Sequence, residues 1–88
     1  MYTVDMPPSD PRSTADALRS AVERDLPNAA VEVSSSSGGH FSLVVKSELF
    51  RGRTMLECHK MVYAAIASLM SGDAPPVHAI DTLKTIAG

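Results

Sequence analysis

The chain has one cysteine and no long apolar run, and each of these shortages argues against a class of protein. Cys58 alone cannot form an internal disulfide, which fits a reducing compartment. We expect the cytoplasm, with the mitochondrion and the nucleus as open alternatives. No stretch approaches the ~20 apolar residues of a membrane-spanning helix, and the first residues lack the pattern of a secretory signal. The net charge of -2 argues against a dedicated nucleic-acid-binding protein.

The 88 residues are enough for a single domain. Residues 1–11 contain Pro7-Pro8 and little that can pack, so we predict a flexible N-terminal tail. Residues 12–88 carry apolar patterns throughout and form the domain. No nucleophile beside a base and no phosphate-binding loop is visible, so no catalytic residue is assigned.

The first patterned segment has apolar residues at helical spacing and predicts a helix over 12–26. Asp10-Pro11 can start it, because aspartate caps helices and proline suits the first helical position. Ser13 or Thr14 could cap it instead.

Two alternating segments then predict a hairpin. Val31 and Val33 mark a short first strand, and a second strand follows over 41–46. Residues 34–39, four serines and two glycines, predict a flexible turn. His40 stands where this turn joins the second strand.

The second half begins with a turn at 50–53. Thr54 and Glu57 have the spacing of a capping box and predict the start of a helix over 54–71. One stripe of this helix is expected to face the core: Met55, His59, Val62, Ile66 and Leu69. Gly72 and Pro75-Pro76 end the helix, and a last strand is expected over 77–85.

Several short segments, taken in their order along the chain, resemble the BolA-like proteins. The matching pieces are 47–52, His59 with Lys60, Val62-Tyr63, His78-Ala79-Ile80, Thr82 and Thr85. The segment 37–41 also resembles the variable loop of the family, which often carries a histidine or cysteine. Two departures stand out: Cys58-His59-Lys60 replaces the usual Arg-His-Arg, and the Thr-Pro and tryptophan of the usual final helix are missing.

The resemblance implies an α/β (α+β) fold with the order α-β-β-α-β, similar to the class II KH domain, with the helices on one face of a three-stranded mixed sheet. It also implies a non-enzymatic adaptor that binds a monothiol glutaredoxin. The two proteins and glutathione would share a bridging [2Fe-2S] cluster in iron–sulfur cluster trafficking or assembly and iron homeostasis, with no cluster expected in the isolated protein. Some bacterial members are DNA-binding regulators, so a nucleic-acid-binding transcriptional regulator is the alternative. Whether the free protein forms a homodimer stays open.

The resemblance implies that His78, at the start of the last strand, is a metal ligand and that His40 can be a second one. Imidazole is a suitable ligand for iron, and Pro75-Pro76 stiffens the chain before His78. His59 is expected to be structural, since it lies on the apolar stripe, and Cys58 to be a partly buried thiol.

The basic turn and the helix after it are the candidate partner-binding surface, with these residues: Arg51, Gly52, Arg53 and Lys60. The same cations could instead form a solvated face or contact DNA.

Overall fold

The computed structural model describes residues 11–88, so the Asp10 cap and most of the tail predicted over 1–11 lie outside the described residues. The tail prediction was wrong for Pro11, which begins the first helix. The helices and strands follow the predicted order α-β-β-α-β, with two added 3-10 turns, η1 and η2. Their bounds are α1 Pro11–Asp25, β1 Ala30–Ser37, β2 His40–Ser47, η1 Glu48–Phe50, α2 Met55–Ile66, η2 Ala67–Leu69 and β3 Ala79–Ala87.

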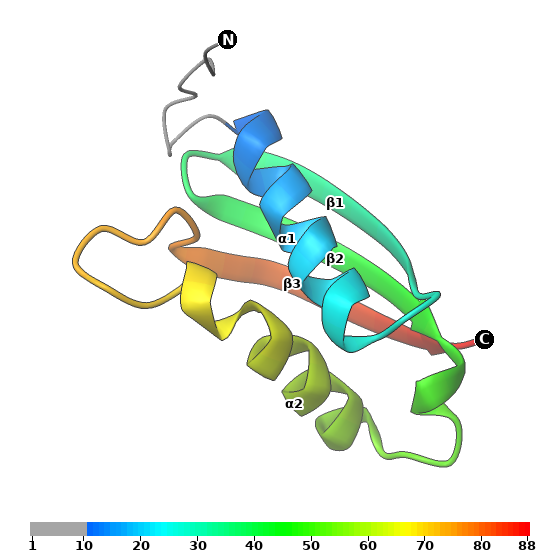
Figure 1. Cartoon of the computed structure of the whole chain (residues 1–88). Helices are drawn as coiled ribbons and strands as arrows, with labels where there is room; N and C mark the ends of the chain where they lie inside the picture. Colours follow the sequence, from blue (N-terminus) through cyan, green and yellow to red (C-terminus); the bar gives the residue numbers. More distant parts are fainter. Residues whose placement is uncertain (1–10) are drawn as a thin grey trace, which may run out of the picture.

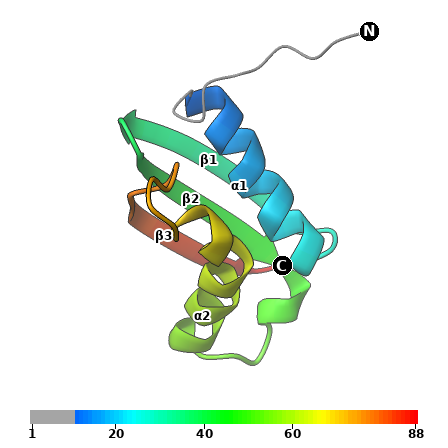
Figure 2. The same cartoon turned by 60° about the vertical axis from the view of Figure 1, so that its left-hand side comes forward.

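The three strands form one mixed sheet in the order β1-β2-β3. β1 and β2 are antiparallel and β2 and β3 are parallel, so the segment that contains α2 connects the two parallel strands. Both helices lie on the same face of this sheet (Figures 1 and 2). The predicted α+β fold, with helices on one face of a three-stranded mixed sheet, is therefore confirmed.

The core lies between the helices and the central strand. On β2 every second residue is fully buried, from Phe41 to Val45, because this face of the strand meets both helices. The helices contribute the predicted residues Leu18, Val22, Val62 and Ile66, each fully buried. Leu69, also predicted in the core, is partly buried and packs against it.

β1 is longer than predicted. It continues through Ser37, so the prediction of a turn over 34–39 was wrong for the serines, and only Gly38 and Gly39 join the two strands. Ser34 pairs with Ser42, and Ser35 pairs with Phe41. The serine side chains are exposed and do not pack in the core. Backbone pairing with β2, rather than side-chain packing, therefore keeps this segment in the sheet.

α2 starts at the predicted capping box. The Glu57 N–H donates to Thr54 Oγ1 over 3.1 Å, and the Thr54 N–H donates to Glu57 Oε1 over 2.9 Å. The helix itself ends at Ile66, and η2 continues it to Leu69, short of the predicted residue 71.

The predicted core stripe of α2 was wrong at its N-terminal end. Met55 is 72% exposed and His59 is half-buried, whereas Cys58 and Ala65 are buried. Cys58 was expected to be partly buried, but its thiol lies 3.9 Å from the carbonyl oxygen of Phe50 inside the core. The helix is thus rotated relative to the predicted stripe.

β3 begins two residues later than predicted and continues to Ala87. Val77, buried, and His78, exposed, therefore precede the strand. A β-bulge interrupts the pairing with β2: Phe41 pairs with Ile80 and Ser42 with Thr82, which leaves Asp81 as the extra residue. In the part of the chain that the structure describes, no helix has the length and apolar character to span a bilayer.

Candidate metal-ligand site

The backbone around His78 is fixed from two sides. The Val77 N–H donates to the Leu69 carbonyl over 3.1 Å, and the buried Val77 side chain anchors the segment in the core. The N–H groups of His78 and Ala79 both donate to the carbonyl oxygen of Gly39, over 2.8 and 3.1 Å. These two bonds tie His78 to the β1–β2 turn.

The imidazole of His78 lies against Gly39. A Cβ atom on Gly39 would be 2.7 Å from Cγ and 2.9 Å from Nδ1 of that ring, closer than packed atoms approach. Gly39 also has a φ of +78°, a conformation that glycine adopts without strain. His78 is exposed, and its ring makes no hydrogen bond to any described residue. The ring thus rests on Gly39 through Cγ and Nδ1, and neither of its nitrogen atoms has a hydrogen-bond partner among the described residues.

His40 is the first residue of β2 rather than part of a mobile turn, and it is held by Asp81. Its Nδ1 lies 3.0 Å from Asp81 Oδ1, and Ser36 Oγ donates to the other oxygen, Oδ2, over 3.1 Å. These three residues come from β1, β2 and the bulge of β3. A histidine that bonds a carboxylate through one nitrogen keeps the other nitrogen for a ligand, an arrangement common around protein-bound metals.

Asp81 was missed by sequence reasoning. An acidic residue three positions after His78 was visible, but the bulge that directs it toward His40 depends on the pairing of β2 with β3. Hydrogen bonds from His40 first, and from Ser36 second, lower the pKa of Asp81 below its ordinary value of 3.8.

The pKa shift of Asp81 predicts how this contact depends on pH. Because folding lowers the pKa, the ionised carboxylate stabilises the folded chain above pH 3.8, and the contribution is lost as pH falls through the lowered value. Asp81→Asn should therefore lower the melting temperature at pH 6, and the difference should disappear in strong acid. Thermal melts across this pH range measure it.

Asp73→Asn is the control for this experiment, since the exposed Asp73 carboxylate makes no ion pair or hydrogen bond with a described residue. It should leave the melting temperature unchanged at each pH. A constant difference for Asp81→Asn from pH 2 to pH 7 would show that the carboxylate charge does not act in this contact.

The structure brings the two predicted ligands to the same end of the sheet. His40 pairs with Ala79, the residue after His78, and Gly39 contacts His78 directly. No set of three or more His, Cys, Asp or Glu side chains in residues 11–88 is arranged to hold a metal ion. The described chain therefore offers exposed imidazoles but not a complete metal site.

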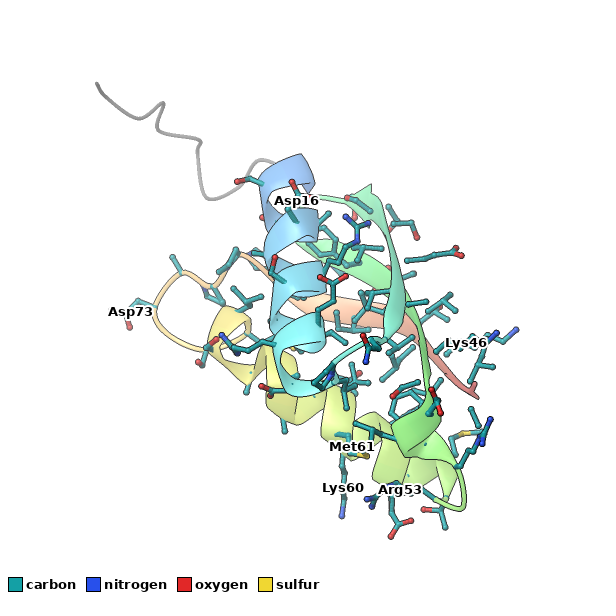
Figure 3. All side chains as sticks on the ribbon, turned by 45° about the vertical axis from the view of Figure 1, so that its right-hand side comes forward. Asp16, Lys46, Arg53, Lys60, Met61 and Asp73 are labelled. Atoms are coloured by element: carbon teal, nitrogen blue, oxygen red, sulfur yellow. The ribbon has the colours of Figure 1, made fainter. Side chains whose placement is uncertain are left out.

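The other site candidates lie at the opposite end. From His40 to Ser47 the central strand rises seven residues, about 23 Å. Beyond Ser47 come η1 and the basic turn, where Arg53 lies near Ala87, the last residue of β3. The candidate partner-binding residues are found on this turn and on the first half of α2: Arg51, Gly52, Arg53 and Lys60. Figure 3 labels Arg53 and Lys60 at this end.

His59 and Cys58 also belong to the end that is remote from His78. His59 is half-buried on the flank of α2, and its ring makes no hydrogen bond to a described residue. Cys58 is buried beneath it with 5% exposure. Neither side chain is near Gly39, so the structure does not join them to His40 and His78.

Comparison with known proteins identifies the family. Residues 14–87 match the family described as BolA-like protein, and the chain therefore belongs to the BolA-like family. Human BolA-like protein 1 is 34% identical over 73 residues, which is 73% of this chain and 51% of that protein. This chain thus spans about half the length of the curated relatives it matches.

Solved structures agree with this assignment. A BolA protein homologue from Coxiella burnetii is 34% identical, with a TM-score of 0.66 over 81% of this chain and 86% of that one. A Bol-like protein from Babesia bovis is 27% identical, with a TM-score of 0.68 over 82% and 81% of the two chains. The expected family and its fold are therefore confirmed.

Proposed function

We propose that this protein is a non-enzymatic adaptor that binds a monothiol glutaredoxin and supplies His78 to a [2Fe-2S] cluster shared between the two. The observation that carries the proposal is the imidazole of His78. Its N–H and that of Ala79 both donate to the Gly39 carbonyl, its ring rests on that glycine, and its nitrogen atoms have no partner among the described residues. Family membership supports the same function.

The residues of this chain fit a contribution of nitrogen ligands. Its single cysteine is buried, with the thiol near the Phe50 carbonyl, so Cys58 is not placed to contact a cluster that a partner brings to the surface. His78 is exposed and His40 is half-exposed. In the proposed complex the glutaredoxin and glutathione therefore supply the thiolates.

The chain's own residues would position the imidazoles rather than perform chemistry. Gly39 leaves room for the ring of His78, and Asp81 holds Nδ1 of His40 so that Nε2 remains for a ligand. Histidine ligation gives an iron–sulfur cluster a higher reduction potential than thiolate ligation alone. It also makes binding depend on pH, because an imidazole must be neutral to bind a metal. Both properties suit transfer of the cluster better than permanent storage.

The test is to mix the purified protein with a cluster-loaded monothiol glutaredoxin and record the visible spectrum of any complex. His78→Ala should abolish or strongly alter the spectrum of the shared cluster. His40→Ala should have a smaller effect, because His40 is only the second of the two proposed ligands and water or another group can take its place. His59→Ala should mainly lower the melting temperature, since it is half-buried on α2.

The three variants control for one another when the spectrum and the melting temperature are measured on each. His78 is exposed, so its loss should leave the fold intact. If His78→Ala supports a wild-type cluster while His59→Ala loses it without loss of stability, the ligand has been assigned to the wrong histidine. If no complex forms with the wild-type protein, the proposed partner is wrong.

A further inference from the structure

A groove runs between the first half of α2 and the outer edge of β3, remote from His78. Its volume is about 430 Å³, within the usual range of ligand sites. The walls are mostly apolar, with Phe50 and Met55 on one side and Leu83 and Ala87 on the other. Nothing in the proposed cluster chemistry uses this groove.

The groove exists because the helix-bearing face of the sheet is less covered at the edge strand β3 than at the central strand β2. On β2, Leu43, Val45 and Ser47 are buried beneath the helices. Their register partners on β3 are Leu83, Thr85 and Ala87, none of which is buried. On this face of the sheet, the side chains of the central strand are thus buried and those of the edge strand remain accessible.

β3 is an edge strand, since it pairs only with β2 in the described sheet. Its outer edge carries unpaired N–H and C=O groups, which can bind an extended peptide by adding a strand. An alternating peptide on such an edge directs every second side chain into the groove beside it. The geometry therefore fits an extended polypeptide.

The cations around the groove indicate the charge of its ligand. Arg53 and Lys84 line it, and no aspartate or glutamate does. The Nε–H of Arg53 donates to the Leu49 carbonyl over 2.9 Å, which fixes the guanidinium and leaves its terminal nitrogens for a carboxylate. Neither Arg53 nor Lys84 forms an ion pair with a described residue.

Several cations gather at this end of a chain whose net charge is negative, and the two carboxylates found there, Glu48 and Glu57, do not line the groove. On α1, Arg19 and Arg24 are neutralised by Asp16 and Asp25. Among residues 13–88, the Lys and Arg side chains without an acidic partner gather toward the other end: Lys46, Arg51, Arg53, Lys60 and Lys84. Figure 3 shows Lys46, Arg53 and Lys60 at that end, with Asp16 and Asp73 away from it.

We infer that this groove binds an acidic, extended segment of a partner protein, which adds a strand to β3 and inserts apolar side chains between α2 and β3. A nucleic acid fits less well, because the walls are apolar and a free strand edge pairs with peptide groups rather than with phosphates. The groove and the His78 site lie at opposite ends of the sheet, so the two can be occupied by different parts of one partner or by two partners.

The probe is a fluorescein-labelled ten-residue peptide in which valine alternates with glutamate, and anisotropy measures its binding to the whole protein. It should bind at least about tenfold more tightly than the same peptide with lysine in place of glutamate. It should also bind more tightly than a version with N-methylated valines, which cannot pair with β3 through those amides. Equal affinity for the lysine peptide or for the N-methylated peptide would overturn the proposal.

Variants locate the binding on the protein. Arg53→Glu combined with Lys84→Glu should weaken binding by about tenfold or more. Lys60→Glu is the matched control, since it reverses an exposed charge on α2 that does not line the groove. It should leave the affinity nearly unchanged, as should His78→Ala, which separates this proposal from that of the shared cluster. Melting temperatures confirm that each variant is folded.

Two other occupants would show themselves in the same assay. Duplex DNA that binds at physiological salt and displaces the peptide through Arg53 and Lys84 would make this a nucleic-acid surface and overturn the proposal. A dimer of the protein that the peptide dissociates would assign the groove to a second copy, with the same consequence. If Lys60→Glu weakened binding as much as the double variant does, the peptide would be held by unspecific attraction between charges. That result would also overturn the proposal.

Discussion

Ile66→Ala should lower the free energy of unfolding by about 2–5 kcal/mol, because it leaves a cavity where a fully buried side chain joins α2 to the core. Ile66 is 0% exposed and was assigned to the core from its spacing. Ile66→Val removes a single methylene and should cost about 0.5–1.5 kcal/mol. Denaturant unfolding, with the slope compared between variants, measures both values.

Leu56→Ala is the control on the same helix, since Leu56 is 64% exposed and lies away from the core face. It should change the stability by less than about 0.5 kcal/mol. If Ile66→Ala also costs less than about 0.5 kcal/mol, α2 does not pack as the structure shows.

Gly39→Ala should be destabilising for two separable reasons. An alanine at a φ of +78° is strained by about 1–2 kcal/mol, and its Cβ would overlap the ring of His78 at 2.7 Å. The ring must therefore move. Its NMR signals should shift, and the visible spectrum of a shared cluster should change.

Gly52→Ala separates these two effects. Gly52 has a similar φ of +75°, but a Cβ there would have nothing within 4 Å. Gly52→Ala should therefore lose only the stability that corresponds to backbone strain. The additional loss of stability in Gly39→Ala then measures the contact with His78. Adding His78→Ala to Gly39→Ala should remove that excess. Equal losses at the two glycines would contradict the contact between Gly39 and the imidazole.

The parts of the fold that depend on local chemistry could be predicted from the sequence. The Thr54–Glu57 capping box forms because its partners are three residues apart on the same turn. The apolar residues Phe41, Leu43 and Val45 stand at every second position, and this spacing defines one face of a strand wherever that strand is placed. Both features were visible without knowledge of the rest of the chain.

The parts that depend on tertiary pairing could not be predicted in this way. The serines of β1 have little preference for strand structure and belong to a strand because β2 pairs with them. On α2, Val62 and Ile66 belong to two possible stripes, so their spacing could not decide whether Cys58 or His59 faces the core. Contact with Phe50 favours Cys58.

The candidate site likewise combines features that the sequence could predict with features that depend on tertiary pairing. The position of His78 shortly after the stiff Pro75-Pro76 segment could be read from the sequence, and so could a basic turn at 51–53. The bond between His40 and Asp81 could not, because it requires a bulge in the parallel pairing of β2 and β3. The separation of the basic turn from the histidines also depends on the direction of β2.

The hydrogen bonds between the His78 segment and Gly39 affect the order in which the protein folds. The hairpin of β1 and β2 can close early, since its strands are neighbours in sequence, but the bonds from His78 and Ala79 to Gly39 join residues far apart in the chain. They form only after the intervening segment, α2 included, has brought β3 beside β2. We therefore expect the imidazole to reach its final position late in folding, so that a newly made chain could supply His78 to the proposed cluster only once its sheet is complete.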